Sequence, residues 1–485
     1  MKYFLFFITL PILLTASEDL ALKVKNLEQQ LKDLKQEMRT HQEDLDERLP
    51  IIEQNEKHSI LDKITFSPEL LLSIQKMDYT TGLIGPNGDD TKIYNHPDPS
   101  YNGQYRRDRY SKDFEPAGYI RMRLNANGDF GDVKFYTRLL YANSSQSHER
   151  LCILSRDVKS SAGGSAFDVD RAYIDYTPDR YNGGTLTFSF GVLPTSGGTP
   201  SHFSQNKQRS SMFPALVFDM NTYGAIVTKK FYDSLYVRAI VAKAYTLKEN
   251  FYPYQCNREN IDNATVLGLY SDFSFDFLGD SMLSFGINLL DDLKAHPYLG
   301  PDIDSSYSHE LGRMLTYGIG LDINNFLDSS NVVFLHTAVS DPNPNGAEDD
   351  YKIIYDLNGT TAGGYSGFTK EDYASGTMLK KMGYSFYLGG RYDLDPQLSL
   401  GAEYNYGSKY WFAATQGAED IFNKLALRGH ALELYGLWDL NKYLNAKVGY
   451  LYMKENYTGS GWHFGEPATK DAKQNIYYLN LEARF

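Results

Sequence analysis

Charged side chains that could bind or select ions recur at every second position of several short segments. In residues 117–127, Arg121 and Arg123 alternate with apolar residues. Because successive side chains of a β-strand point to opposite faces, this spacing predicts a strand with one charged and one apolar face. The same pattern places further charges on polar faces: Lys134, Arg138, Arg171, Arg238, Glu403 and Glu433. Where such faces surround water, their field attracts or repels ions.

Residues for covalent or metal chemistry show no comparable pattern. The ten histidines are scattered, and no Gly-x-Ser-x-Gly sequence occurs. Cys152 and Cys256 lack the Cys-x-x-Cys spacing of metal and redox sites. We therefore predict that the chain is not an enzyme and has no metal site or cofactor. Both cysteines fall in expected loops, and their spacing leaves open whether they form a disulfide.

Composition excludes several classes of protein. The formal net charge of −13 argues against a nucleic-acid binder. The longest apolar run, Tyr3–Leu14, is shorter than the roughly 20 residues of a membrane-spanning helix. The 39 Tyr and 40 Gly suit the aromatic girdles and tight turns of a membrane barrel, and they also fit a Tyr-rich soluble β-protein.

Sixteen strands are expected to position the charged residues. They are predicted at 64–77, 117–127, 132–143, 167–177, 185–194, 221–231, 235–245, 264–276, 281–292, 313–325, 331–340, 382–393, 398–411, 429–440, 443–456 and 474–485. Short polar links alternate with long loops between them, which is typical of barrels with tight turns at one end and long loops at the other. The last strand ends on Phe485, and an even strand count places both chain ends on one side.

The residues before the strands divide into two parts. Residues 1–16 have one Lys before an apolar run that ends in small residues, as in a signal peptide. Within residues 18–58, Leu20–Ile52 carries a heptad pattern, with Leu27, Leu31, Leu34 and Met38 among its core positions. This pattern predicts a short N-terminal α-helical coiled coil with partner chains; a single amphipathic helix lying on another surface is the alternative. Residues 59–485 are then an all-β transmembrane barrel of about 16 antiparallel strands.

This layout resembles bacterial outer-membrane porins. In particular, it is similar to an uncharacterised porin-like family, a domain of unknown function with an N-terminal coiled coil. The most specific likeness lies in Leu193–Asp219, which opens with Leu-Pro-Thr-Ser-Gly-Gly-Thr-Pro and ends with Pro-Ala-Leu-Val-Phe-Asp. The resemblance implies a homotrimer in the outer membrane, in contact with lipid and lipopolysaccharide, with the helix and the C-terminus in the periplasm.

The resemblance also implies that the third long loop, residues 195–220, folds into the barrel and narrows it; an ordinary surface loop is the alternative. Its basic residues are His202, Lys207 and Arg209. We expect a channel for passive diffusion of ions and small hydrophilic solutes, with a weak preference for anions. Three alternatives stay open: the charges pair and only keep the lumen polar, the barrel is plugged and has a structural or adhesin role in the cell envelope, or it is a barrel enzyme.

Overall fold

The computed structural model describes residues 25–26, 29–40, 63–82, 93–95, 104–106, 110–145, 166–180, 183–245, 264–276, 278–295, 309–327, 330–345, 379–415, 419–457, 467 and 469–485. The chain divides into two compact units, Met1–Lys63 and Ile64–Phe485. The expected signal peptide, Cys152 and Cys256 lie outside the described residues.

In the first unit, residues 25–26 and 29–40 are helical. Leu31, Leu34 and Met38 are exposed on this helix. The predicted helical conformation is found here, and its pairing into a coiled coil stays a prediction. No described helix combines the length and apolar character needed to cross a membrane.

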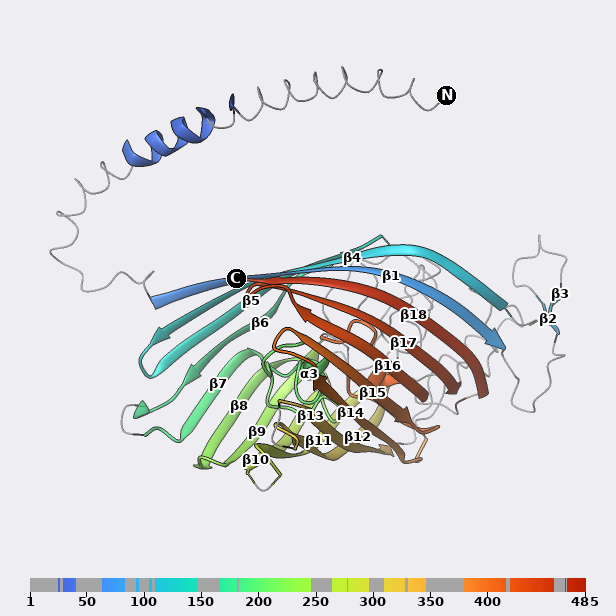
Figure 1. The fold of residues 1–485 in the computed structure, drawn as a ribbon. Helices are drawn as coiled ribbons and strands as arrows, with labels where there is room; N and C mark the ends of the chain where they lie inside the picture. Colours follow the sequence, from blue (N-terminus) through green and yellow to red (C-terminus); the bar gives the residue numbers. More distant parts are fainter. Residues whose placement is uncertain are drawn as a thin grey trace, which may run out of the picture. The chain divides into compact units, whose positions relative to one another are not determined.

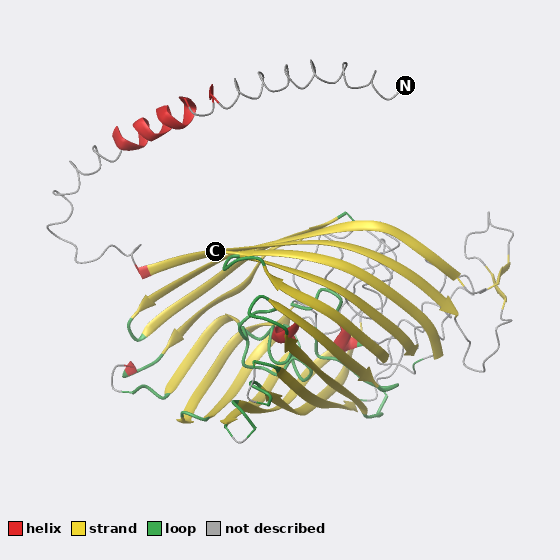
Figure 2. Cartoon of the chain, in the orientation of Figure 1, coloured by secondary structure: helices red, strands yellow, loops and turns green. Residues whose placement is uncertain are grey.

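The second unit is a closed barrel of sixteen strands (Figures 1 and 2), each antiparallel to its neighbours in chain order. The barrel strands are β1 (Ile64–Gly82), β4 (Tyr110–Phe130), β5 (Val133–Ser144), β6 (Ala166–Tyr176), β7 (Leu186–Leu193), β8 (Asn221–Tyr232), β9 (Leu235–Tyr245), β10 (Thr265–Phe275), β11 (Ser281–Ala295), β12 (His309–Ile323), β13 (Val332–Pro344), β14 (Gly383–Asp393), β15 (Leu398–Gly407), β16 (Gly429–Asp439), β17 (Leu444–Tyr457) and β18 (Thr469–Arg484). β1 closes the barrel against β18, with Glu69 opposite Arg484. The prediction of sixteen antiparallel strands is confirmed.

Several strand ends differ from the predicted bounds: β1 continues to Gly82, β12 begins at His309 and β18 begins at Thr469. β4 begins at Tyr110 rather than at 117, because a register shift against β1 lies between its residues Phe114 and Ala117 and interrupts the period of two. A separate two-stranded sheet, β2 (Ile93–Asn95) and β3 (Gln104–Arg106), lies within an expected loop.

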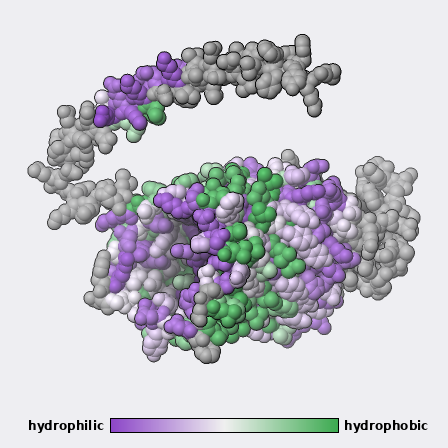
Figure 3. All heavy atoms as spheres, viewed as in Figure 1, coloured by the Kyte–Doolittle hydropathy of each residue, from purple (hydrophilic) through white to green (hydrophobic). Residues whose placement is uncertain are grey.

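Strand faces follow the predicted alternation. On β16, Leu432, Leu434 and Trp438 are exposed, whereas Glu433 and Tyr435 are buried. Figure 3 shows hydrophobic residues gathered over the middle of the visible strands, with hydrophilic residues toward both ends. An outward apolar belt and an inward polar face are the pattern of barrels surrounded by lipid.

The connections alternate in length as predicted. Residues 233–234 join β8 to β9, whereas residues 194–220 separate β7 from β8. The two ends of the barrel sequence meet at one edge, where the Phe485 N–H donates to the Pro68 carbonyl at 3.1 Å. The long connection 194–220 and the later connection 408–428 position the site described next.

Candidate functional site

The loop of residues 195–220 lies inside the barrel. Its polar side chains and carbonyls contact inward-facing side chains of strands around the whole wall. These contacts include Lys207 with Glu69 of β1 and Glu482 of β18, Arg209 with Asp272 of β10, Thr199 with Asp322 of β12, and Asn206 with Asp439 of β16. Because these strands stand on different sides of the barrel, the wall encloses the loop.

Glycine permits the tight path of this loop. Gly197 has a φ of +79°, in the left-handed region that favours glycine. At Gly198, an added Cβ would lie 1.6 Å from the Phe213 carbonyl oxygen. The close approach brings the Ala215 N–H within 2.8 Å of the Thr199 carbonyl, which accepts its hydrogen bond. After it, the short helix α3 (Ser201–Ser204) carries His202, so two glycines set the position of the basic residues that follow.

A second internal loop, residues 408–428 with 408–415 and 419–428 described, was not predicted to enter the barrel. The expected strand 398–411 ends instead at Gly407, where an added Cβ would meet the Leu427 carbonyl oxygen at 1.9 Å. The indole N–H of Trp411, which is fully buried, donates to the Leu425 carbonyl at 2.9 Å. The segment therefore turns into the lumen and packs there, rather than continuing along the wall.

The two loops share an apolar core within the barrel. The Asp219 N–H donates to the Ala414 carbonyl at 2.8 Å, next to a parallel bridge between Asp219 and Thr415. Buried apolar side chains from both loops belong to one cluster: Phe213, Leu216, Val217, Phe218, Trp411, Phe412, Leu425 and Leu427. Hydrophobic burial is therefore the main force that holds the loops together.

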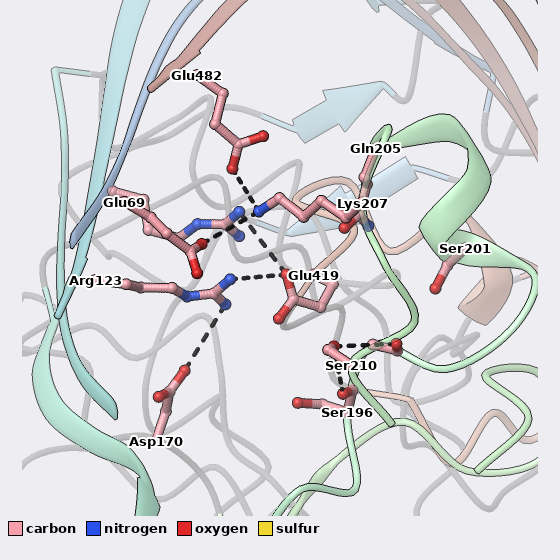
Figure 4. Close-up of polar contacts among 12 residues, drawn as sticks. Glu69, Arg123, Asp170, Ser196, Ser201, Gln205, Lys207, Ser210, Glu419 and Glu482 are labelled. Atoms are coloured by element: carbon pink, nitrogen blue, oxygen red, sulfur yellow. Dashed lines mark hydrogen bonds and ion pairs between the residues drawn. The ribbon is translucent and has the colours of Figure 1, made fainter. Parts of the chain in front are cut away.

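Four arginines of β4, β5 and β6 meet the second loop at one carboxylate; Figure 4 shows one of them, Arg123, between Glu419 and Asp170. We call Arg121, Arg123, Arg138 and Arg171 the arginine cluster. Glu419 lies at its centre, with oxygens 2.8 Å from Arg123, 3.4 Å from Arg138, 3.9 Å from Arg121 and 4.0 Å from Arg171. Asp170 of β6 is the second carboxylate, 2.7 Å from Arg138 and 3.7 Å from Arg123.

Burial and charge set the protonation of the loop residues. Burial alone would raise the pKa of Glu419, but Arg123, Arg138 and Arg121 bring it well below its ordinary value. Burial lowers the pKa of His202 to about 4. Burial also lowers the pKa of Lys207, against the attraction of Glu482. Glu419 is therefore ionised and His202 neutral near neutral pH, so His202 adds no charge to the lumen.

A second ionic group surrounds Lys424, in the 3-10 helix η3 (Lys424–Ala426). Its Nζ lies 2.6 Å from Glu403 of β15 and also pairs with Glu433 of β16. Glu433 accepts a further contact from Lys447 of β17 at 2.7 Å. The sequence predicted the two carboxylates on polar faces, but Lys424 was missed because its segment shows no strand pattern.

Of the remaining predicted site residues, Arg209 and Arg238 are paired inside the barrel, whereas Lys134 is partly exposed. Arg238 and Arg209 share Asp272, at 2.8 Å and 3.2 Å. Lys134 lies apart from both ionic groups: it pairs with Asp129 at 3.2 Å, and its side chain is 34% exposed. Among the described residues, no group of His, Cys, Asp or Glu side chains is arranged to hold a metal ion.

A polar cavity of about 60 Å³ connects the two main ionic groups. Its lining includes Arg121, Lys207, Glu419, Lys424, Glu433 and Tyr478. These residues come from β4, both internal loops, β16 and β18. The cavity therefore lies between the internal loops and one arc of the wall, and charges of both signs line it.

A closed sixteen-stranded barrel with an apolar exterior, a charged interior and internal loops has the architecture of a porin-like barrel. The chain belongs to the family described as "Protein of unknown function (DUF3373)", whose model matches residues 120–481. The resemblance to an uncharacterised porin-like family is thereby confirmed.

Solved structures with a similar fold include three outer-membrane proteins. OprB of Pseudomonas putida at high pH has 10% identity and a TM-score of 0.47, over 88% of this chain and 95% of that chain. The outer-membrane channel DcaP of Acinetobacter baumannii has 12% identity and a TM-score of 0.42, over 87% and 97%. OmpF of Salmonella typhi in complex with daunomycin has 12% identity and a TM-score of 0.41, over 86% and 97%. The comparison with curated proteins gave no match.

Proposed function

We propose that the chain is an outer-membrane channel for passive diffusion of ions and small hydrophilic solutes. The observation that carries the proposal is the polar cavity between the internal loops and the wall. Its lining includes Lys207 and Glu419 of the loops and Arg121 and Glu482 of the wall, which pair with one another at its edge. In this function, the 195–220 loop narrows the lumen, as expected from the sequence, and the 408–428 loop narrows it further.

We also propose a weak preference for anions, which depends on the arginine cluster, because the lining of the cavity itself holds four cationic and four acidic side chains. The arginine cluster and Lys207 supply five cations, against the four carboxylates of Glu69, Asp170, Glu419 and Glu482 that contact them. Most of these charges neutralise one another, so only the small surplus acts on a passing ion. A reversal potential in a salt gradient that indicates preferential passage of cations would contradict this preference.

The same proposal places the barrel in the bacterial outer membrane, with lipid around the apolar belt and lipopolysaccharide at the outer leaflet. The helix of residues 29–40 and the C-terminus then face the periplasm. The exposed stripe of Leu31, Leu34 and Met38 supports a coiled coil between copies, and hence a homo-oligomer such as a trimer. Chemical cross-linking of the mature protein tests this: deletion of residues 20–52 would abolish or weaken the oligomer.

A plugged barrel with a structural or adhesin role is the second candidate. The apolar core shared by the two loops favours it, because Trp411, Phe412 and Phe218 fill lumen space with side chains that exclude water. In that case the polar cavity is a closed pocket rather than part of a passage.

Single-channel conductance in a planar bilayer separates the two candidates. The protein must first be shown to be folded by heat-modifiable migration on a gel. Steady steps from wild type that change in size in Lys207→Gln, which lines the cavity, and not in Lys134→Gln, which lies apart, support the channel. Silence from folded protein supports the plug. Equal changes in the two variants would show that current does not pass this cavity.

A further inference from the structure

A row of outward-facing polar side chains crosses four neighbouring strands, β15 to β18, near one end of the barrel (Figure 1). Tyr406 of β15 lies opposite His430 of β16, and His430 lies in turn opposite Lys454 of β17. Lys454 then lies opposite Lys473 of β18. We call these four residues the β15–β18 row. Because opposed residues of paired strands share a face, the four side chains form one strip, about 14 Å long at the usual strand spacing.

The β15–β18 row lies just beyond the apolar belt. On β17 and β18 the exposed side chains of Val448 and Leu479 lie opposite each other in this belt. The rings of Tyr450 and Tyr477 come next toward the row and pack together, with centroids 5.1 Å apart. Each lysine of the row lies four residues beyond the tyrosine of its own strand. Aromatic rings at the edge of an apolar belt mark the boundary between lipid and water, so the row lies at the level of lipid headgroups.

The two lysines of the row oppose each other without a paired acid. Lys473 is exposed and Lys454 half-buried, and neither forms an ion pair within the part of the chain that the structure describes. The outward carboxylate of Asp113 on β4 pairs instead with Lys76 of β1, at 3.3 Å. Asp471, two residues beyond Lys473 on the same face, offsets one of the two charges at most. Like charges directly opposite on paired strands destabilise a sheet, and an anion between the two ammonium groups would relieve their repulsion.

Aromatic rings surround the other half of the row. The His430 Nδ1 lies 2.6 Å from the Tyr404 hydroxyl, and the His430 ring lies 5.0 Å from that of Tyr406. Phe386 of β14 packs against Tyr404 and Tyr406, with centroids 5.8 Å and 5.3 Å apart. Such rings offer a broad apolar face with hydroxyl groups at its edge. A sugar ring, which is apolar on its faces and polar at its rim, fits this surface better than an acyl chain does.

We propose that the β15–β18 row binds the headgroup of a lipid that carries phosphate on a sugar ring. The two lysines bind the phosphate through their ammonium N–H groups, and Tyr406 and His430 contact the sugar. The row lies at the barrel end where the long connections 408–428 and 458–468 begin, away from the contact of Phe485 with Pro68. Placing this lipid in the outer leaflet rests on the orientation given in the proposed function, whereas binding at the row does not.

The binding test uses the full-length mature protein folded in a nonionic detergent, with lipid A, an acylated and phosphorylated disaccharide, as the probe. Native mass spectrometry measures its dissociation constant. Lys454→Gln and Lys473→Gln each remove one charge from the row. Lys243→Gln is the matched control, because Lys243 faces outward beside another long connection but lies opposite Thr265 and Tyr223. We expect each row variant to weaken binding about fivefold or more, and the control to change it little.

Changes in the lipid separate the two halves of the site. Lipid A without its phosphates should bind wild type and the row variants equally weakly. Tyr406→Leu should weaken the binding of lipid A but not that of phosphatidylglycerol, which has a phosphate and no sugar ring. Equal effects of the three lysine variants, or none, overturn the site, and equal effects of Tyr406→Leu on both lipids overturn the sugar contact. If a glutamine variant gives no folded barrel, dephosphorylated lipid A decides on wild type alone: unchanged affinity overturns the phosphate site.

A second copy of the chain is the competing occupant of this surface. In that case the glutamine variants alter the cross-linked oligomer and leave lipid A binding unchanged, which also overturns the inference. Conductance separates the inference from the proposed function, because the row lies outside the barrel and its variants should leave single-channel current unchanged. A silent barrel that binds lipid A through the row loses the channel and keeps this site. A conducting barrel whose row variants bind lipid A like wild type keeps the channel and loses the site.

Discussion

Asp219 joins the two internal loops, and its protonation is expected to control how firmly they hold together. Its N–H donates to the Ala414 carbonyl, and its Oδ1 accepts from the Gly197 N–H, each at 2.8 Å. The residue is 3% exposed. Burial raises the pKa of Asp219 to about 7; the hydrogen bond from Gly197 opposes this rise, and the nearby charge of Glu419 adds to it.

The direction of the pH effect follows from the two pKa values. Folding raises the pKa of Asp219 from its ordinary value of 3.8, so the folded loops favour the protonated carboxyl. This contribution to stability is fully present below 3.8 and is lost as pH rises through about 7. The difference between the two pKa values of Asp219 corresponds to roughly 4 kcal/mol of stabilisation that is lost at high pH. This loss would shift the equilibrium for local opening of the loops by about a thousandfold.

Hydrogen exchange at the amides of residues 197 and 219 measures this opening. We compare wild type with Asp219→Asn at about pH 5 and about pH 8, after correction for intrinsic exchange rates. In wild type, protection should fall strongly between the two conditions. In Asp219→Asn it should change little, because the amide oxygen still accepts from Gly197 and no charge is buried. The same pH dependence in both proteins, or weaker protection of the variant at the higher pH, would refute the reasoning.

Two further predictions concern the ionic group around Lys424 and the outer face of the wall. Lys424→Met leaves the buried carboxylates of Glu403 and Glu433 without the cation between them, at an expected cost of roughly 3–5 kcal/mol in denaturant unfolding. Lys447→Met should cost less, because Lys424 still pairs with Glu433, and equal losses would contradict a central role for Lys424. Leu479→Arg places a charge on the outward apolar face, at a cost of up to about 2–4 kcal/mol in lipid. Asn480→Arg, on the inward face, is its control: the fraction of folded barrel inserted into vesicles should fall for Leu479→Arg alone, and equal insertion would argue against lipid contact at this position.

The barrel wall could be predicted because its physical constraint repeats along the sequence. A strand between lipid and a polar interior must alternate, so Leu432, Leu434 and Trp438 reveal their face without knowledge of their neighbours. The largest difference from the predicted strands, the start of β4, lies at a register shift that interrupts this period. The sequence pattern alone is thus sufficient to predict a strand wherever successive side chains alternate between lipid and the polar interior.

The internal loops could be predicted only in part. The family resemblance indicated that the 195–220 loop enters the barrel, but nothing local to Trp411 or Glu419 indicates that their partners lie on distant strands. The contact of Glu419 with Arg123 spans 296 positions of the sequence. Such residues are placed by the shape and charge of the finished barrel, which a single sequence without homologues does not reveal.

The charges explain why each loop segment has one place in the lumen. Lys207 lies between the carboxylates of Glu69 and Glu482, Glu419 lies among arginines, and Lys424 lies between Glu403 and Glu433. Exchanging a loop cation with the loop carboxylate would bury like charges together, which costs several kcal/mol per unpaired ion by general experience. Charge pairing therefore specifies the position of loops whose apolar core could pack in other ways. The loops largely neutralise the wall charges that could be predicted from the sequence. The ion selectivity of the proposed channel therefore depends on the small net charge that remains after pairing, and not on the number of arginines along the strands.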